Sequence, residues 1–122
     1  MSKRIVCVDH VQLPVSDLIE ATAWYSKILE LEVMSEGWLK FSEGPVLMLH
    51  YTNKDTKVAW RSDTDFPMPA FMLLSNNIEQ LHRVLIENNV FIRMYQDEGF
   101  GIVLKFVDPF GNELGAYQPH AR

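Results

Sequence analysis

The chain has 122 residues, 48% of them hydrophobic and 22% charged, which is the size and composition of one globular domain that can bury a core. Its 16 acidic residues outnumber its 11 basic ones, and the resulting net charge of −5 argues against nucleic acid as a partner. A single cysteine rules out a disulfide within one chain, and no apolar run is long enough for a membrane span or a signal peptide, so we expect a cytoplasmic protein with no membrane partner.

The first half of the chain is predicted to form a strand, a helix and three further strands. Residues 5–15 alternate regularly from position 10, which indicates a strand with two different faces. From residue 17 to about residue 30 the apolar residues recur at helical spacing, and Asp17 with Glu20 can form a capping box. Short apolar runs separated by Ser-Glu-Gly and Ser-Glu-Gly-Pro turns then complete a β-α-β-β-β order, at 32–34, 38–41 and 46–51.

The second half repeats this order about sixty residues later. An apolar strand at 70–74 precedes a helix that Asn77 with Gln80 can cap. The pair Asn88-Asn89 then supplies the residue type that, after glycine, best tolerates the left-handed conformation at a helix end. Three more strands are expected, at 90–95, 101–107 and 113–117.

We therefore predict an α+β fold in which residues 1–122 form a single domain of two βαβββ modules. Module one is expected at about 5–52 and module two at about 70–118. The segment between them, about 53–69, is polar and contains proline, so it is expected to be a linker.

A tight corner separates the last two predicted strands, within the sequence KFVDPFGNELGAY at 105–117. Pro109 fixes its own φ at about −65°, Asp108 can accept hydrogen bonds from the backbone that follows it, and Gly111 permits a positive φ. Each residue has its own mechanical task, and together they predict a rigid hairpin.

With this corner, the repeated β-α-β-β-β unit resembles the vicinal oxygen chelate superfamily, which includes glyoxalase I, extradiol dioxygenases, fosfomycin-resistance enzymes and bleomycin-resistance proteins. The opening DHVQLPVSD at 9–17 and the run ATAWYSKILEL at 21–31 resemble the usual first strand and first helix of that family. The resemblance covers nearly the whole chain. Glu30 departs from it, because the family commonly has a glycine at the end of this helix.

The resemblance implies curled mixed sheets that form a concave cup, with the helices on the convex side and a ligand on the concave side. It also implies a homodimer, because a second chain usually completes the cup in proteins of this size. Strand alternation assigns the side chains independently. The set expected to face the helices is Val11, Leu13, Val15, Leu47, Leu49 and Tyr51. The set expected to face the cup in module one is His10, Gln12, Met48 and His50.

Enzymes of this family commonly hold a divalent metal with four inward ligands, and the resemblance places those ligands at His10, Met48, Ala70 and Gly115. Only the histidine suits Zn²⁺, Mn²⁺ or Fe²⁺, and Gly115 leaves the cup empty where a carboxylate would sit, so no metal cofactor is expected. An alternative stays open in which His10, His50 and Glu113 hold a divalent metal as a displaced triad.

The first interpretation of function is a metal-free small-molecule binding protein resembling bleomycin-resistance proteins, a homodimer that sequesters an aromatic or amphipathic ligand. The enzyme alternative is a glyoxalase-like lyase, isomerase or dioxygenase that uses the displaced triad; no other catalytic motif is present. A third interpretation is a protein-interaction or regulatory remnant of an enzyme, with a cup filled by its own side chains. The residues expected to line the ligand site are His10, Gln12, Trp38, Met48, His50, Trp60, Met72, Phe100, Glu113 and Tyr117.

Overall fold

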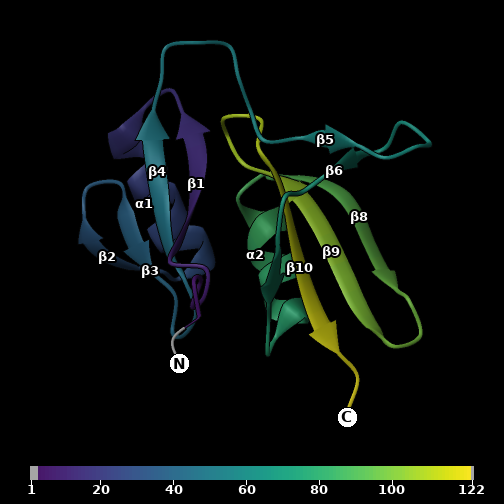
Figure 1. Ribbon diagram of the computed structural model, residues 1–122. Helices are drawn as coiled ribbons and strands as arrows, with labels where there is room; N and C mark the ends of the chain where they lie inside the picture. The colour runs from purple at the N-terminus through teal and green to yellow at the C-terminus, as the bar shows by residue number, and fades with distance from the viewer. Residues whose placement is uncertain (1–2, 122) are drawn as a thin grey trace. The chain divides into compact units, whose positions relative to one another are not determined.

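The computed structural model describes residues 3–121, and in this part of the chain two helices and ten strands form two compact units (Figure 1). The first unit ends at Asn53 and the second begins at Lys54. We call them module one and module two. No helix within residues 3–121 is long and apolar enough to cross a membrane. The α+β fold of two βαβββ modules is confirmed.

Module one is a four-stranded mixed sheet with one helix against it. The strands lie in the order β1-β4-β3-β2, and only β1 and β4 are parallel. The helix contacts β2, β3 and β4, and Figure 1 shows it behind the sheet. The elements are β1 (His10–Val15), α1 (Leu18–Leu29), β2 (Glu32–Ser35), β3 (Trp38–Lys40) and β4 (Val46–Tyr51).

Alternation along β1 and β4 separates a buried side from an accessible one, as the sequence predicts. Leu13, Val15, Leu47 and Leu49 are buried on the side of α1. Tyr51 has the same parity but is 56% exposed, because it is the last residue of its strand. The predicted strand at 5–15 is also shorter than expected: residues 5–9 are exposed and β1 begins at His10.

Module two has the same plan, with a sheet in the order β7-β10-β9-β8 and β7 parallel to β10. Helix α2 contacts β8, β9 and β10. Its buried Ile78 and Leu85 share that side with Leu104, Phe106, Leu114 and Ala116, which are also buried. The elements are β7 (Met72–Leu74), α2 (Ile78–Glu87), β8 (Phe91–Asp97), β9 (Gly101–Val107) and β10 (Glu113–Pro119).

Both helices have the caps that the sequence predicts. The backbone N–H of Glu20 donates to Asp17 Oδ1 at 2.9 Å, and that of Gln80 donates to Asn77 Oδ1 at 3.2 Å. Asn89 follows the end of α2 with a left-handed φ of 57°. Glu30 ends α1 with the same φ of 57°, so it adopts the conformation for which glycine is the usual choice.

The segment expected to be a linker, 53–69, is not featureless. It carries β5 (Trp60–Arg61) and β6 (Pro67–Met68), which pair as an antiparallel hairpin. Before the hairpin, the backbone of Val58 bonds to module two twice. Its N–H donates to Asn112 Oδ1 at 2.8 Å, and its carbonyl accepts from the Glu113 N–H at 2.9 Å. The hairpin therefore belongs to module two.

The predicted corner at 108–112 is rigid for reasons visible in its hydrogen bonds. Asp108 Oδ1 accepts from the N–H groups of Phe110 at 2.9 Å and Asn112 at 2.8 Å, while Asp108 Oδ2 accepts from Asn112 Nδ2 at 2.8 Å. Gly111 has a φ of +89°. Asp108 and Asn112 are both buried, and the amide oxygen of Asn112 holds Val58. The corner thus fastens the hairpin segment to the last strand.

Candidate functional site

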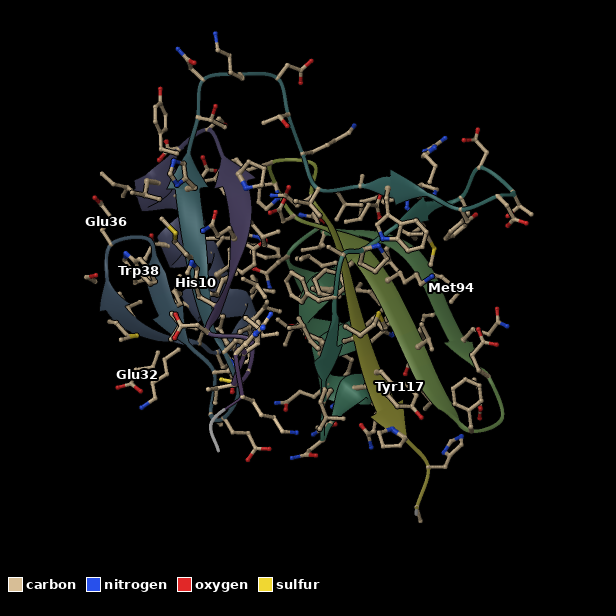
Figure 2. The ribbon with its side chains drawn as sticks, viewed as in Figure 1. His10, Glu32, Glu36, Trp38, Met94 and Tyr117 are labelled. Carbon is tan, nitrogen blue, oxygen red and sulfur yellow. The ribbon has the colours of Figure 1, made fainter. Side chains whose placement is uncertain are left out.

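In each module the side of the sheet away from the helix, which we call the far face, carries most of the predicted site residues. On module one these are His10, Gln12, Trp38, Met48 and His50. Met48 pairs with Gln12 on one side and Trp38 on the other, so these three side chains form a row across the sheet. Figure 2 labels His10 and Trp38 on this sheet.

The ring of His10 is held on both nitrogens. Nδ1 lies 2.9 Å from Asp9 Oδ2, and Nε2 lies 3.0 Å from Gln12 Nε2. Because an amide nitrogen can only donate, Nε2 must accept, and Nδ1–H then donates to the carboxylate. The ring also lies 5.7 Å from the Trp38 ring between centroids. The lone pair that would bind a metal is therefore engaged by Gln12.

The positions of the two histidines do not fit the displaced metal triad. In the parallel pairing of β1 with β4, His10 is opposite Val46, and His50 is opposite Pro14, four residues further along. At about 3.3 Å per residue, their backbones are offset by about 13 Å along the strands. Two imidazoles that project from the same face of one sheet at that spacing cannot both bring a ring nitrogen to about 2.1 Å from one ion.

The third member of that triad, Glu113, is not an available ligand either. It is 4% exposed at the start of β10, and Arg93 Nε lies 3.0 Å from each of its carboxylate oxygens. Arg93 Nη2 adds a contact of 2.6 Å to Oε1, and the guanidinium lies 5.1 Å from the centre of the Phe91 ring. A buried charge needs a partner, and Arg93 supplies it to Glu113.

The expectation that Gly115 leaves an empty space is also corrected. A Cβ placed on this glycine would collide with Met72 Sδ and would lie 3.0 Å from Met72 Cε and 3.2 Å from Pro69 Cγ. The Met72 side chain thus lies over the glycine. The thioether of Met72, from the neighbouring strand, therefore occupies the space beside Gly115.

The predicted aromatic residues of module two are accessible. Trp60 is 52% exposed and its indole N–H donates to the Pro69 carbonyl at 2.7 Å. Tyr117 is half-buried, and its hydroxyl donates to the Phe100 carbonyl at 3.3 Å. Phe100 is 66% exposed, with its ring 5.9 Å from that of Tyr117.

Sequence reasoning missed three residues of the module two far face: Arg93, Met94 and Lys105. Met94 and Lys105 are opposite each other on β8 and β9, and Figure 2 labels Met94 on this sheet with Tyr117. The signal for the two cations was their place in apolar strands, where a Lys or Arg at a half-buried position needs an explanation.

Two exposed ion pairs of module two shift the pKa values of Arg61, Asp65 and Asp97. Arg61 Nε lies 2.9 Å from Asp65 Oδ1 across the β5–β6 turn, and this hydrogen bond raises the pKa of Arg61 and lowers that of Asp65. The charge of Glu113 contributes to the raised pKa of Arg61 as the smallest cause. A hydrogen bond from His120 is the main cause of the lowered pKa of Asp97.

No protein-family model matches the chain, and no curated protein sequence matches it. Solved structures do. A structure assigned to the glyoxalase family, from Bacillus anthracis, is similar at a TM-score of 0.75 and 19% identity, covering 98% of this chain and 100% of that one. TnmS3, an antibiotic binding protein from Streptomyces sp. CB03234, is similar at a TM-score of 0.73 and 22% identity, covering 98% and 100%.

A third similar structure is the genomically encoded fosfomycin resistance protein FosX from Listeria monocytogenes, with a TM-score of 0.74, 16% identity and 95% of each chain covered. At such identities the likeness concerns the fold and leaves the activity open. Both modules have the strand and helix order that the sequence predicted, and the similar structures span nearly the whole chain. The chain therefore has the vicinal oxygen chelate fold.

Proposed function

We propose that the protein binds a small aromatic or amphipathic molecule on its far faces, without a metal ion. The observation that carries this proposal is the set of side chains at the four positions where enzymes of this fold hold a metal. Met48, Ala70 and Gly115 offer a thioether, a methyl group and bare backbone, and Met72 covers the last of them. This donor set does not fit a hard or borderline divalent cation.

The apolar surface of the far face in module two supports binding of such a molecule. Leu74 is 70% exposed, and Met72 and Phe91 are exposed as well. Met72 and Leu74 lie on β7 at one edge of the sheet, beside Tyr117 on β10, and Phe91 lies with Met94 on β8 at the other edge. Exposed apolar side chains that gather in one place mark an interaction surface, and methionine adapts to ligands of irregular shape.

The similar structures support the same class of function. TnmS3 is an antibiotic binding protein and FosX a fosfomycin resistance protein, so this fold serves molecules of antibiotic size. The enzyme alternative lacks a comparable observation, because its triad needs the two histidines at one ion and a Glu113 without Arg93.

The first test is a metal analysis combined with a thermal-shift screen. Protein purified without a chelator or an affinity tag is expected to carry well under one metal equivalent per chain. A ligand from a panel of aromatic antibiotics and metabolites should raise the melting temperature, since at about 100 times its Kd it adds about 2.7 kcal/mol to the free energy of unfolding. One tightly bound metal per chain would overturn the proposal, and a panel without any hit would count against it.

A matched pair of variants localises the binding. Leu74→Ser changes an exposed apolar residue of the far face, and Ile86→Ser changes an exposed apolar residue of α2 in the same module. Ligand affinity is expected to fall at least fivefold in the first variant and to stay within twofold in the second. Equal effects of the two variants would show that the far face is not the binding surface.

A further inference from the structure

We propose that module two binds an acidic group of its ligand at Lys105, so that the ligand is an amphipathic anion. This inference rests on the proposed function, because it names the chemical class of molecule that the same far face takes.

Lys105 lies in the middle of the far face of module two. Its neighbours on β9, Leu104 and Phe106, are buried on the side of α2, so the lysine side chain leaves the opposite side. Across the sheet it is opposite Gly115 on β10 and Met94 on β8. Lys105 is half-buried there, between positions that carry no charge.

The ammonium group has only uncharged partners among residues 3–121. Nζ lies 3.4 Å from Met68 Sδ and 5.2 Å from the centre of the Phe66 ring, both on the β5–β6 hairpin. The nearest acid along the paired strand is Glu113, whose two oxygens are taken by Arg93. A half-buried cation has lost part of its hydration, and an anionic group on a ligand would restore a charged partner.

Two other cations of module two are already paired. Arg93 holds Glu113, and Arg61 holds Asp65. Lys105 differs from both because the contacts of its ammonium, Met68 and Phe66, are uncharged, so its positive charge is available to a bound molecule. The row across the four strands is Met72, Gly115, Lys105 and Met94, so the lysine stands in a row with two methionines and no second charge.

The surroundings also suggest what the rest of the ligand is. Gly115, which has no side chain, and Met72, which covers it, form an apolar surface beside Lys105. Phe66 and Tyr117 add aromatic rings within the same module. A planar or apolar body with one carboxylate, sulfonate or similar group would satisfy both features.

Two dyes with the same skeleton test this inference. 1-Anilinonaphthalene-8-sulfonate carries one negative charge, and N-phenyl-1-naphthylamine is the same molecule without the sulfonate. Fluorescence titration gives a Kd for each dye, and the ratio of the two Kd values isolates the contribution of the charge. The titrations use the intact protein, Lys105→Met, Lys105→Arg and, as a control of equal charge change on the helix side of the same module, Arg83→Met.

In Lys105→Met the ratio of the sulfonate Kd to the neutral Kd is expected to rise at least tenfold. In Lys105→Arg and Arg83→Met it should stay within threefold of the unchanged protein. Neutral dye binding reports whether Lys105→Met keeps its surface, since that dye does not need the ammonium.

The outcomes separate the two proposals. If the neutral dye binds and the ratio does not change in Lys105→Met, the assignment of Lys105 is overturned while the binding function stands. If Arg83→Met changes the ratio as much as Lys105→Met, only the net charge matters and the assignment is again overturned. If neither dye binds the unchanged protein, both proposals fail for aromatic ligands.

Discussion

Glu113 lies almost fully buried in β10, with Arg93 Nε 3.0 Å from each of its oxygens. A buried carboxylate loses the solvation that stabilises its charge, and the guanidinium replaces that solvation with hydrogen bonds to both oxygens. Removing one member of such a pair leaves the other without compensation. The stability of module two should therefore depend strongly on Arg93.

Arg93→Met is expected to lower the free energy of unfolding by about 3 kcal/mol, because it strands a buried carboxylate. The matched control is Arg83→Met, which breaks an exposed pair with Glu79 on α2 and should cost less than about 1 kcal/mol. Urea unfolding followed by circular dichroism measures both. Similar losses in the two variants would mean that the Arg93–Glu113 pair adds nothing beyond a surface pair.

The contact between Gly115 and Met72 should also affect the free energy of unfolding. Gly115→Ala introduces a methyl group where Met72 lies, so we expect a loss of roughly 1–3 kcal/mol from overpacking. Met72→Ala in the same chain should remove most of that loss, because it empties the occupied space. A double-mutant cycle by urea unfolding measures the coupling, and a coupling near zero would contradict this contact.

Strand alternation predicted the side of the sheet for most site residues, but not what each one contacts. Glu113 was predicted on the inner side as a ligand, and its partner Arg93 comes from two strands away, next to a register shift between Ile92 and Met94. Similarly, Gly115 was predicted to leave a space, but the long Met72 side chain on the adjacent strand fills it. Such contacts depend on register and rotamers, which a periodic pattern does not encode.

At the scale of elements, the ends of the two helices offer a direct comparison. Glu30 and Asn89 both have a φ of 57°, in the region where a Cβ crowds the backbone. Asparagine tolerates this conformation better than glutamate, and glycine tolerates it best. The end of α1 is therefore more strained than the residue that follows α2.

Glu30→Gly is expected to raise the free energy of unfolding by up to about 1 kcal/mol, because it removes this strain. Asn89→Gly, the matched control, should gain only about a few tenths of a kcal/mol. Thermal and urea unfolding of both variants decide the point. A destabilised Glu30→Gly would show that the glutamate side chain contributes more than its backbone conformation costs.

The corner at 108–112 should contribute to stability through the side chain of Asn112. Asn112→Ala removes the hydrogen bonds that its amide makes with the Val58 N–H and with Asp108 Oδ2, at about 1–3 kcal/mol in total. Asn77→Ala, which removes an exposed helix cap, should cost about 1 kcal/mol. Hydrogen exchange at Val58 should also speed up in Asn112→Ala alone. Unchanged exchange there would contradict the proposed fastening of the hairpin.

The same corner explains why one element was predicted and another missed. Helix caps and the corner depend on residues within a few positions of one another, so the sequence shows them directly. The β5–β6 hairpin has two-residue strands, too short for any periodicity, and its anchor joins Val58 to Asn112 across 54 positions. The polar composition therefore predicted a linker and gave no sign of the hairpin within it.

At the scale of the whole molecule, the internal repeat carried the prediction of the fold. The two copies of one β-α-β-β-β order could be recognised in the sequence because each copy buries its own helix against its own sheet. The ligand could not be predicted in the same way, because one fold hosts many functions and only particular side chains distinguish them.

The sequence resemblance implies a homodimer, which remains a prediction. Sedimentation velocity is expected to show a species of about 28 kDa, twice the 14.1 kDa of one chain. A sharp boundary at the mass of one chain at micromolar concentration would contradict it.

The thioethers near Lys105 make the far face of module two sensitive to oxidants. Met68 contacts the ammonium, Met94 is opposite Lys105, and Met72 covers the glycine beside it. Peroxide would turn these side chains into polar, chiral sulfoxides. Protein treated with peroxide would then lose affinity for apolar molecules while its fold persisted, and a methionine sulfoxide reductase supplied with a thiol reductant would restore that affinity.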